Sequence, residues 1–244
     1  MPPFPARSAH SQCLRCSHLQ PIYLFADSQL LFWKDKELLF LTSLKEWLTP
    51  PAPKAAYIGA SNGDHPAFYA IFAAAMAGIG IAECRLIRSS FLAEDQTFLQ
   101  HADLILLAGG EVEQGWNILQ GRRISDLILK RYAEGTLLIG VSAGAVHLGL
   151  GAPVERAGQG TSLIATLQVV PFLIDVHAEQ HGWEQLRRAI RLLDGTAKAI
   201  GIPAGGGGVY YPDGTLEAIR YPLHEFSKET EQARSTRLII TKSC

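Results

Sequence analysis

The chain has 244 residues, and its 22 basic and 23 acidic side chains give a net charge of -1. This balance argues against a dedicated nucleic-acid or anionic-membrane binder, because such proteins need a basic excess to displace counterions. With 48% hydrophobic and 18% charged residues the chain can bury a large core, and no apolar run reaches the roughly 20 residues that cross a bilayer.

The first 20 residues contain three prolines and several serines and lack the apolar segment of a signal peptide. We expect residues 1–20 to be a flexible tail and the protein to be cytoplasmic, with reduced cysteines. Cys13 and Cys16 form a CxxC motif, but the chain has no second ligand pair at zinc-site spacing. No metal and no cofactor are therefore expected.

Short apolar runs then alternate with helix-like stretches. Strands are predicted at residues 21–25, 30–33, 55–58, 84–87, 102–107 and 137–141, and helices at residues 38–48, 66–77, 125–132, from 143 onward and at 184–193. The Asp-Gly turn at residues 213–214 predicts a C-terminal β-hairpin from strands at 209–211 and 215–219.

Continuous apolar strands separated by helices are typical of a parallel sheet that is covered on both faces. The sequence therefore predicts an α/β fold with a doubly wound, mostly parallel sheet. No linker divides the chain after residue 54, so we expect a single domain over residues 21–244. Its ligands should bind at the carboxyl ends of the strands.

The most informative stretch is Gly-Val-Ser-Ala-Gly at residues 140–144, between an apolar strand and a helix. It matches G-x-S-x-G, in which a serine on a sharp turn projects its hydroxyl over the sheet edge and tolerates only small neighbours. Ser142 is the candidate nucleophile, and the N–H of Ala143 would point at a developing oxyanion. The alternative is a plain strand-to-helix turn in which the serine caps the helix.

A second oxyanion donor should come from another strand end, and the strand that runs into Gly109 and Gly110 supplies one. A serine also needs a base, and His177 follows the apolar stretch at residues 169–176. A carboxylate must orient that base. Two candidates remain open: Asp175, which shares a strand face with His177, and Glu155, in the loop after the elbow helix.

At these residues the sequence resembles the aspartyl dipeptidase (peptidase E) and cyanophycinase family of serine peptidases, whose fold is similar to that of class I glutamine amidotransferases. The resemblance covers residues 21–221 and rests on residues 57–64, Gly109-Gly110, the elbow, residues 171–177 and the final hairpin. It implies that Ser142 is the nucleophile and His177 its base. It also favours Glu155 as the acid, with Gly110 and Ala143 as oxyanion donors.

The family's substrates carry aspartyl residues, so the resemblance implies a cationic partner, for which Arg188 on the amphipathic helix is the candidate. The chain departs from the family after Gly109-Gly110, where only Gln114 could supply a substrate-binding amide, and at Ala204, where the family carries an acid.

We therefore expect a serine peptidase that cleaves small peptides or isopeptides, with an aspartyl preference implied by the resemblance. It would work without nucleic-acid or membrane partners, and a homodimer is compatible with the fold. The alternatives are a non-peptidase acyl-transfer hydrolase and a catalytically silent binding protein on the same fold.

Overall fold

The computed structural model describes residues 19–48, 51–156, 160–193, 197–228 and 230–235. Cys13, Cys16 and nearly all of the expected tail lie outside these residues. Within the described ranges, no helix combines the length and apolarity that a membrane span requires.

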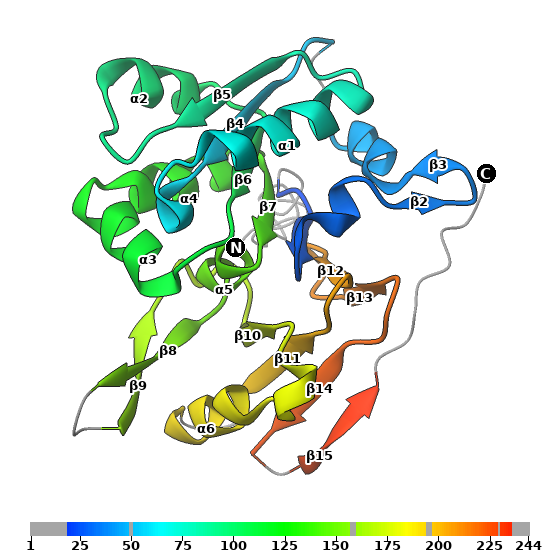
Figure 1. The fold of residues 1–244 in the computed structure, drawn as a ribbon, viewed down its shortest axis with the longest axis vertical. Coiled ribbons are helices and arrows are strands. Elements are labelled where there is room, and N and C mark those ends of the chain that lie inside the picture. Colours follow the sequence, from blue (N-terminus) through cyan, green and yellow to red (C-terminus); the bar gives the residue numbers. More distant parts are fainter. Residues whose placement is uncertain (1–18, 49–50, 157–159, 194–196, 229, 236–244) are drawn as a thin grey trace, which may run out of the picture.

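A seven-stranded sheet with the order β13-β12-β1-β7-β6-β4-β5 forms the centre of the molecule (Figure 1). The five neighbouring strands β1, β7, β6, β4 and β5 run parallel. β12 and β13 add an antiparallel hairpin next to β1. The bounds are β1 Ile22–Phe25, β4 Lys54–Ile58, β5 Glu83–Ile87, β6 Leu104–Leu107, β7 Leu137–Val141, β12 Gly207–Tyr210 and β13 Leu216–Ile219. The predicted α/β class and the predicted hairpin are confirmed.

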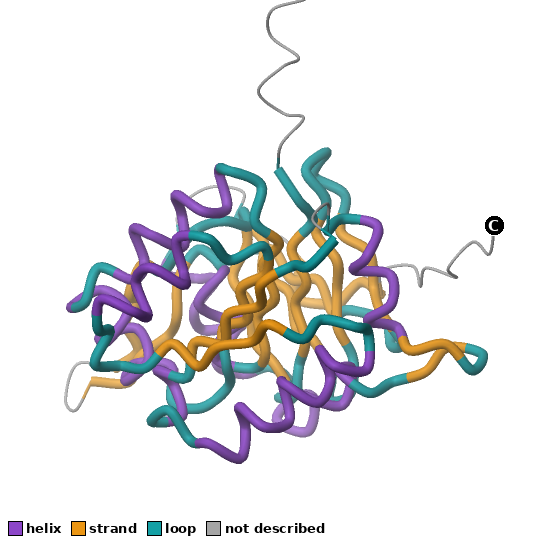
Figure 2. Tube along the Cα trace, turned by 90° about the horizontal axis from the view of Figure 1, so that it is seen from above, coloured by secondary structure: helices purple, strands orange, loops and turns teal. Residues whose placement is uncertain are grey.

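Helices cover both faces of this sheet, as Figure 2 shows. Successive strand residues point to opposite faces, so Tyr23 and Phe25 belong to one core cluster while Ile22 and Leu24 belong to another. The first cluster includes α1 and two 3-10 helices, and the second includes α2, α3, α4 and α5. The bounds are η2 Ser28–Leu31, η3 Phe40–Glu46, α1 Pro66–Gly78, α2 Ala93–Gln100, α3 Val112–Gly121, α4 Ile124–Ala133 and α5 Ala143–Leu148.

A second sheet, with the order β10-β11-β14-β15, lies beside the first and is covered by α6. Its strands are β10 Phe172–Val176, β11 Lys198–Ile202, β14 His224–Ser227 and β15 Thr230–Ser235, and α6 spans Glu184–Leu192. Trp183, Leu186 and Phe226 form the centre of a separate small core between α6 and these strands. A two-stranded ribbon, β8 Gly151–Arg156 and β9 Gly160–Ala165, extends outward from the same region (Figure 1).

The structure corrects three sequence predictions. Residues 28–31 form the 3-10 helix η2 instead of a strand, because the Asp27 side chain accepts the N–H of Gln29 and caps the turn. Residues 38–48 do not form an α-helix: positive φ at Lys36 and Glu37 closes a tight turn between β2 Lys34–Asp35 and β3 Leu38–Leu39, and η3 follows. The predicted C-terminal hairpin is followed by two more strands, β14 and β15, which join the apolar stretch before His177 in the second sheet.

The packing of α5 depends on a buried neutral histidine. His147 is 1% exposed, and its Nε2 lies 2.8 Å from the carbonyl oxygen of Val112, so that nitrogen carries the proton and donates. Its ring also packs against Trp116. Burial lowers the pKa of His147 from its ordinary value of 6.5, because desolvation opposes the charged form.

We predict that the free energy of unfolding falls as the pH drops below about 6.5, where the unfolded chain takes up a proton that folded His147 resists. One such proton gives a slope of at most about 1.4 kcal/mol per pH unit. Denaturant unfolding between pH 7.5 and 5.5, compared in the wild type and His147→Gln, measures it. An unchanged pH slope in the variant would show that His147 is not the linked group.

Candidate functional site

Ser142 lies at the turn between β7 and α5 with a strained backbone. Its φ of 51° and ψ of −116° lie outside the conformations that L residues favour. The turn is held by backbone hydrogen bonds from the Ser142 N–H to Phe25 and from the Val146 N–H to the Ser142 carbonyl, of 2.9 and 3.2 Å. The strain is therefore imposed by the strand before the turn and the helix after it.

The small residues around Ser142 leave no room for side chains. A Cβ atom at Gly140 would lie 2.6 Å from the Cα of Ala145, and one at Gly144 would lie 2.0 Å from the carbonyl oxygen of Leu107. Both distances are far inside van der Waals contact. The G-x-S-x-G spacing is thus required by packing as well as by the turn.

The turn after β6 brings two more glycines against Ser142. A Cβ atom at Gly109 would lie 3.0 Å from the Cβ of Ser142. Gly110 has a φ of 137°, and a Cβ there would lie 2.1 Å from the carbonyl oxygen of Ser61. No backbone acceptor among the described residues takes the N–H of Gly110 or of Ala143, so neither donor is used by the backbone of the described chain.

His177 reaches Ser142 from the second sheet. It directly follows β10, its φ is 45°, and its N–H donates to the carbonyl of Ile202 on β11. Its Nε2 lies 3.1 Å from the Oγ of Ser142, within hydrogen-bond distance. The carboxyl ends of β7 and β10 therefore bring together a hydroxyl and an imidazole that are 35 residues apart in the chain.

The two candidate carboxylates lie in different places. Asp175 is half-buried on β10, where one oxygen accepts the N–H of Val176 and the other has no partner among the described residues. Burial raises the pKa of Asp175 above its ordinary value. The nearby His177 opposes this shift without reversing it. Glu155 is exposed on the β8–β9 ribbon and accepts the hydroxyl of Thr161 at 2.7 Å. No hydrogen bond from the described residues reaches Nδ1 of His177.

The two candidate substrate-binding side chains are bonded to residues other than Ser142 and His177. Gln114, on α3, donates from Nε2 to the carbonyl of Ala60 at 3.4 Å. Arg188 is exposed on α6 and forms an ion pair with Glu184. As predicted, α6 begins at Glu184; positive φ at Gly182 and Trp183 separates it from the 3-10 helix η5 Glu179–His181. Arg188 and His177 therefore lie on separate elements.

A cavity of about 240 Å³ opens beside Ser142. Ala108, Gly109 and Gly110 line it together with the serine, and the other described lining residues come from β4, β6 and β7, from η2 with the preceding Asp27, from η4 Ala60–Asn62 and from α1. Among the described residues that line it, Asp27 is the one acid, and its carboxylate accepts the N–H groups of Gln29 and Gly205. Asp27 was not among the predicted site residues, although an acidic residue directly after an apolar run marks the carboxyl edge of a sheet.

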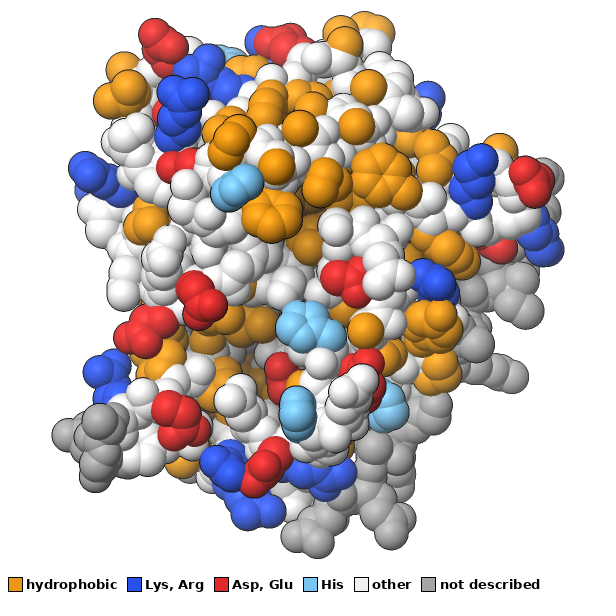
Figure 3. Space-filling model, viewed as in Figure 1, with side chains coloured by type: hydrophobic (Ala, Val, Ile, Leu, Met, Phe, Trp, Pro, Cys, Tyr) orange, Lys and Arg blue, Asp and Glu red, His pale blue; other side chains and the backbone are white. Residues whose placement is uncertain are grey.

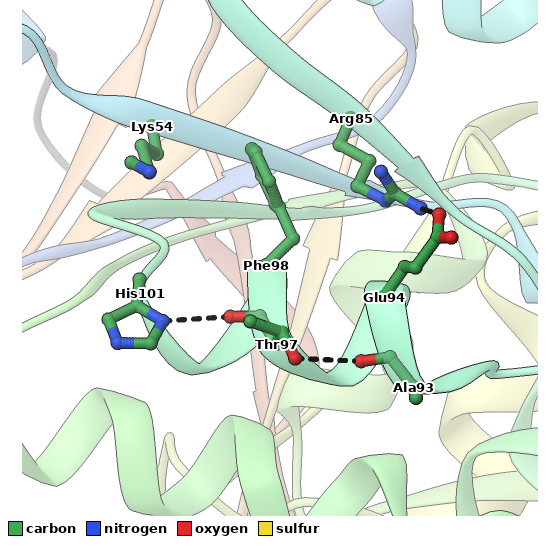
Figure 4. Close-up of a pocket in the computed structure, with 7 residues that line it drawn as sticks. All are labelled: Lys54, Arg85, Ala93, Glu94, Thr97, Phe98 and His101. Atoms are coloured by element: carbon green, nitrogen blue, oxygen red, sulfur yellow. Dashed lines mark hydrogen bonds and ion pairs between the residues drawn. The ribbon is translucent and has the colours of Figure 1, made fainter.

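A second hollow, of about 410 Å³, lies at the β5 edge of the sheet against α2 (Figure 4). Its cations are already paired, Lys54 with Glu83 and Arg85 with Glu94 and Asp95. β4 and β6 separate this edge from β7 and Ser142, so the hollow is not part of the serine site. Within the described ranges, no group of three His, Cys, Asp or Glu residues is arranged to hold a metal ion.

Comparison with known proteins gives a family and a fold. The sequence model of peptidase family S51 matches residues 12–207. A search of curated proteins finds no match. Among solved structures, a peptidase from an acI-B1 Actinobacterium has a TM-score of 0.66 at 15% identity, over 92% of this chain and 100% of the other.

A protein from Listeria monocytogenes EGD-e that is assigned to peptidase E has a TM-score of 0.56, also at 15% identity, over 91% of this chain and 100% of the other. At this level of identity the two structures show that the fold is shared.

We predict that Ser142→Gly is more stable than Ser142→Ala by about 1 kcal/mol, because glycine relieves a strained backbone that alanine retains. Both variants lose the hydroxyl, so the comparison isolates the backbone. Urea denaturation of the two proteins measures the difference. Equal stability, or a more stable alanine variant, would mean that the turn carries no strain.

Proposed function

The chain belongs to peptidase family S51, a family of serine peptidases, and we propose that it cleaves small peptides or isopeptides through an acyl-enzyme formed on Ser142. The observation that carries this proposal is the 3.1 Å contact between the Oγ of Ser142 and the Nε2 of His177. A histidine at this distance can take the serine proton as the oxygen attacks a carbonyl carbon.

In the first step His177 accepts the proton from Ser142, and the serine oxygen bonds to the carbonyl carbon of the scissile bond. The tetrahedral intermediate then collapses, the C–N bond breaks, and His177 gives its proton to the leaving amine. In the second step His177 takes a proton from water, the resulting hydroxide attacks the acyl-enzyme ester, and the proton returns to Ser142. The histidine is thus base and acid in turn.

The N–H groups of Gly110 and Ala143 are the proposed oxyanion donors. Both are free of backbone acceptors among the described residues, and Ala143 is the first residue of α5, where the helix dipole adds positive potential. Substitution of Gly110 would displace the backbone here, because a Cβ would lie 2.1 Å from the carbonyl oxygen of Ser61.

For the acid we propose Asp175, in place of the Glu155 that the family resemblance favours. The charge of His177 lowers the pKa of Asp175, so the two side chains interact electrostatically. The second carboxylate oxygen of Asp175 has no hydrogen-bond partner among the described residues. A carboxylate close to His177 stabilises the imidazolium that forms during attack. Glu155 instead accepts a hydrogen bond on the exposed ribbon.

We predict that Ser142→Ala and His177→Ala each lower kcat/KM on cleavable dipeptides by roughly 10³-fold or more. Both variants should also abolish covalent labelling of the enzyme by a serine-reactive phosphonate. Intact-protein mass spectrometry and release of the free amine measure the two effects. His181→Ala, at an exposed histidine four residues further on, is the matched control and should retain both.

Labelling without hydrolysis across a dipeptide panel would favour the non-peptidase acyl-transfer hydrolase. An unlabelled wild type at neutral pH would point to a catalytically silent binding protein. Labelling that survives in Ser142→Ala would exclude Ser142 as the nucleophile.

We predict that Asp175→Asn lowers kcat by roughly 10²- to 10⁴-fold, while Glu155→Gln leaves it within a few-fold of the wild type. A second measurement uses stability. Because the pKa of folded Asp175 is raised above 3.8, its contribution to stability is present at low pH and is lost as the pH rises. The asparagine variant should therefore gain stability relative to the wild type between pH 4 and pH 7. A large kcat loss in Glu155→Gln alone would restore Glu155 as the acid.

A further inference from the structure

The cavity beside Ser142 has mostly apolar walls. Leu106 and Ala108 form its floor at the end of β6, and Tyr57 and Phe72, which are at most 3% exposed, form a rigid aromatic wall. The rings of Tyr57 and Phe72 are packed against each other with centroids 5.3 Å apart. Side chains in such a packed cluster hold the shape of the cavity whether or not it is filled.

The rim of the cavity is apolar too. Phe68 and Ile71, one turn apart on α1, line it and are 51% and 36% exposed. Figure 3 shows apolar side chains gathered above the central hollow of this face of the molecule. Exposed apolar groups beside a reactive serine are covered when an apolar substrate group binds, and covering them is favourable.

The charge in the cavity is opposite to what an acidic substrate needs. No Lys, Arg or His is found among the described residues that line it, and its only ionisable acid is Asp27. The Asp27 carboxylate already accepts N–H groups from Gln29 and Gly205 at 2.8 and 2.7 Å. An aspartyl side chain would enter without a cationic partner and beside a like charge, and both conditions disfavour it.

The size of the cavity fits one side chain. A dry apolar cavity of about 150 Å³ is known to accept benzene, so the 240 Å³ here accommodates a phenyl or an isobutyl group. The volume lies below the roughly 300 Å³ at which pockets for drug-sized ligands begin.

We propose that this cavity receives the side chain on the acyl side of the scissile bond and selects a neutral apolar residue, such as phenylalanine or leucine, over aspartate. The inference rests on Ser142 being the nucleophile, since it is the serine that fixes which substrate group faces the cavity. The apolar floor and walls supply affinity. The negative charge of Asp27, with no Lys, Arg or His among the described lining residues, disfavours acidic side chains.

Two experiments test the selectivity separately from the chemistry. The wild-type enzyme is given dipeptides that differ only in the first residue, Phe, Leu, Asn or Asp, and kcat/KM is measured by amine release. We expect Phe and Leu to exceed Asp and Asn by about tenfold or more. In parallel, the inactive Ser142→Ala protein is titrated with the same dipeptides by calorimetry, where Phe should bind more tightly than Asp.

A variant pair sharpens the result. Ile71→Arg places a cation at the rim and should shift the Phe-to-Asp ratio of kcat/KM toward Asp by about tenfold. Leu192→Arg also replaces an exposed aliphatic residue by arginine, on α6 and outside the cavity. It should leave the ratio unchanged.

A wild type that prefers Asp, or cleaves Phe and Asp dipeptides equally, would overturn the apolar assignment while leaving the serine mechanism in place. Turnover of none of the dipeptides, with Phe still bound more tightly by Ser142→Ala, would support the cavity assignment and contradict the proposed peptidase activity. Absence of any preference in both turnover and binding would overturn the inference.

Discussion

The site depends on one packing constraint, the close approach of three strand ends around Ser142. The N–H of this residue bonds to the end of β1, Gly144 packs on the carbonyl of Leu107 at the end of β6, and β7 delivers the serine itself. There is no space for a Cβ at Gly140 or Gly144, and the chain turns into α5 with Ser142 at positive φ. The strain projects the hydroxyl above the sheet.

The second sheet supplies what the first lacks. Parallel β10 and β11 end toward the same region as β7, and His177 leaves β10 with a positive φ that brings its ring to the serine. The glycine-rich turn after β11 also meets the first sheet, because Gly205 donates to Asp27 after β1. The chain as a whole carries a net charge of only -1, while two acidic residues, Asp27 and Asp175, lie near the site.

Local signals were sufficient for much of this architecture. The strand at residues 137–141, the helix from Pro66 and the hairpin around residue 213 were predictable from apolar runs, a first-turn proline and an Asp-Gly turn. The split into two sheets was not, because β10 has the same apolar pattern as a strand of the first sheet and pairing partners are not encoded locally. The shape of the cavity likewise depends on segments far apart in the chain, because residues from Asp27 to Ser142 line it.

The site can be checked in a crystal structure of the enzyme inactivated by a benzylphosphonate. We predict a covalent bond to the Oγ of Ser142, with the phosphonyl oxygen about 2.7–3.1 Å from the N–H nitrogens of both Gly110 and Ala143. His177 should lie beside the adduct, and the benzyl group should lie in the cavity next to Phe72 and Ile71. A phosphonyl oxygen that faces solvent, or an adduct on another residue, would show that Ser142 does not act as proposed.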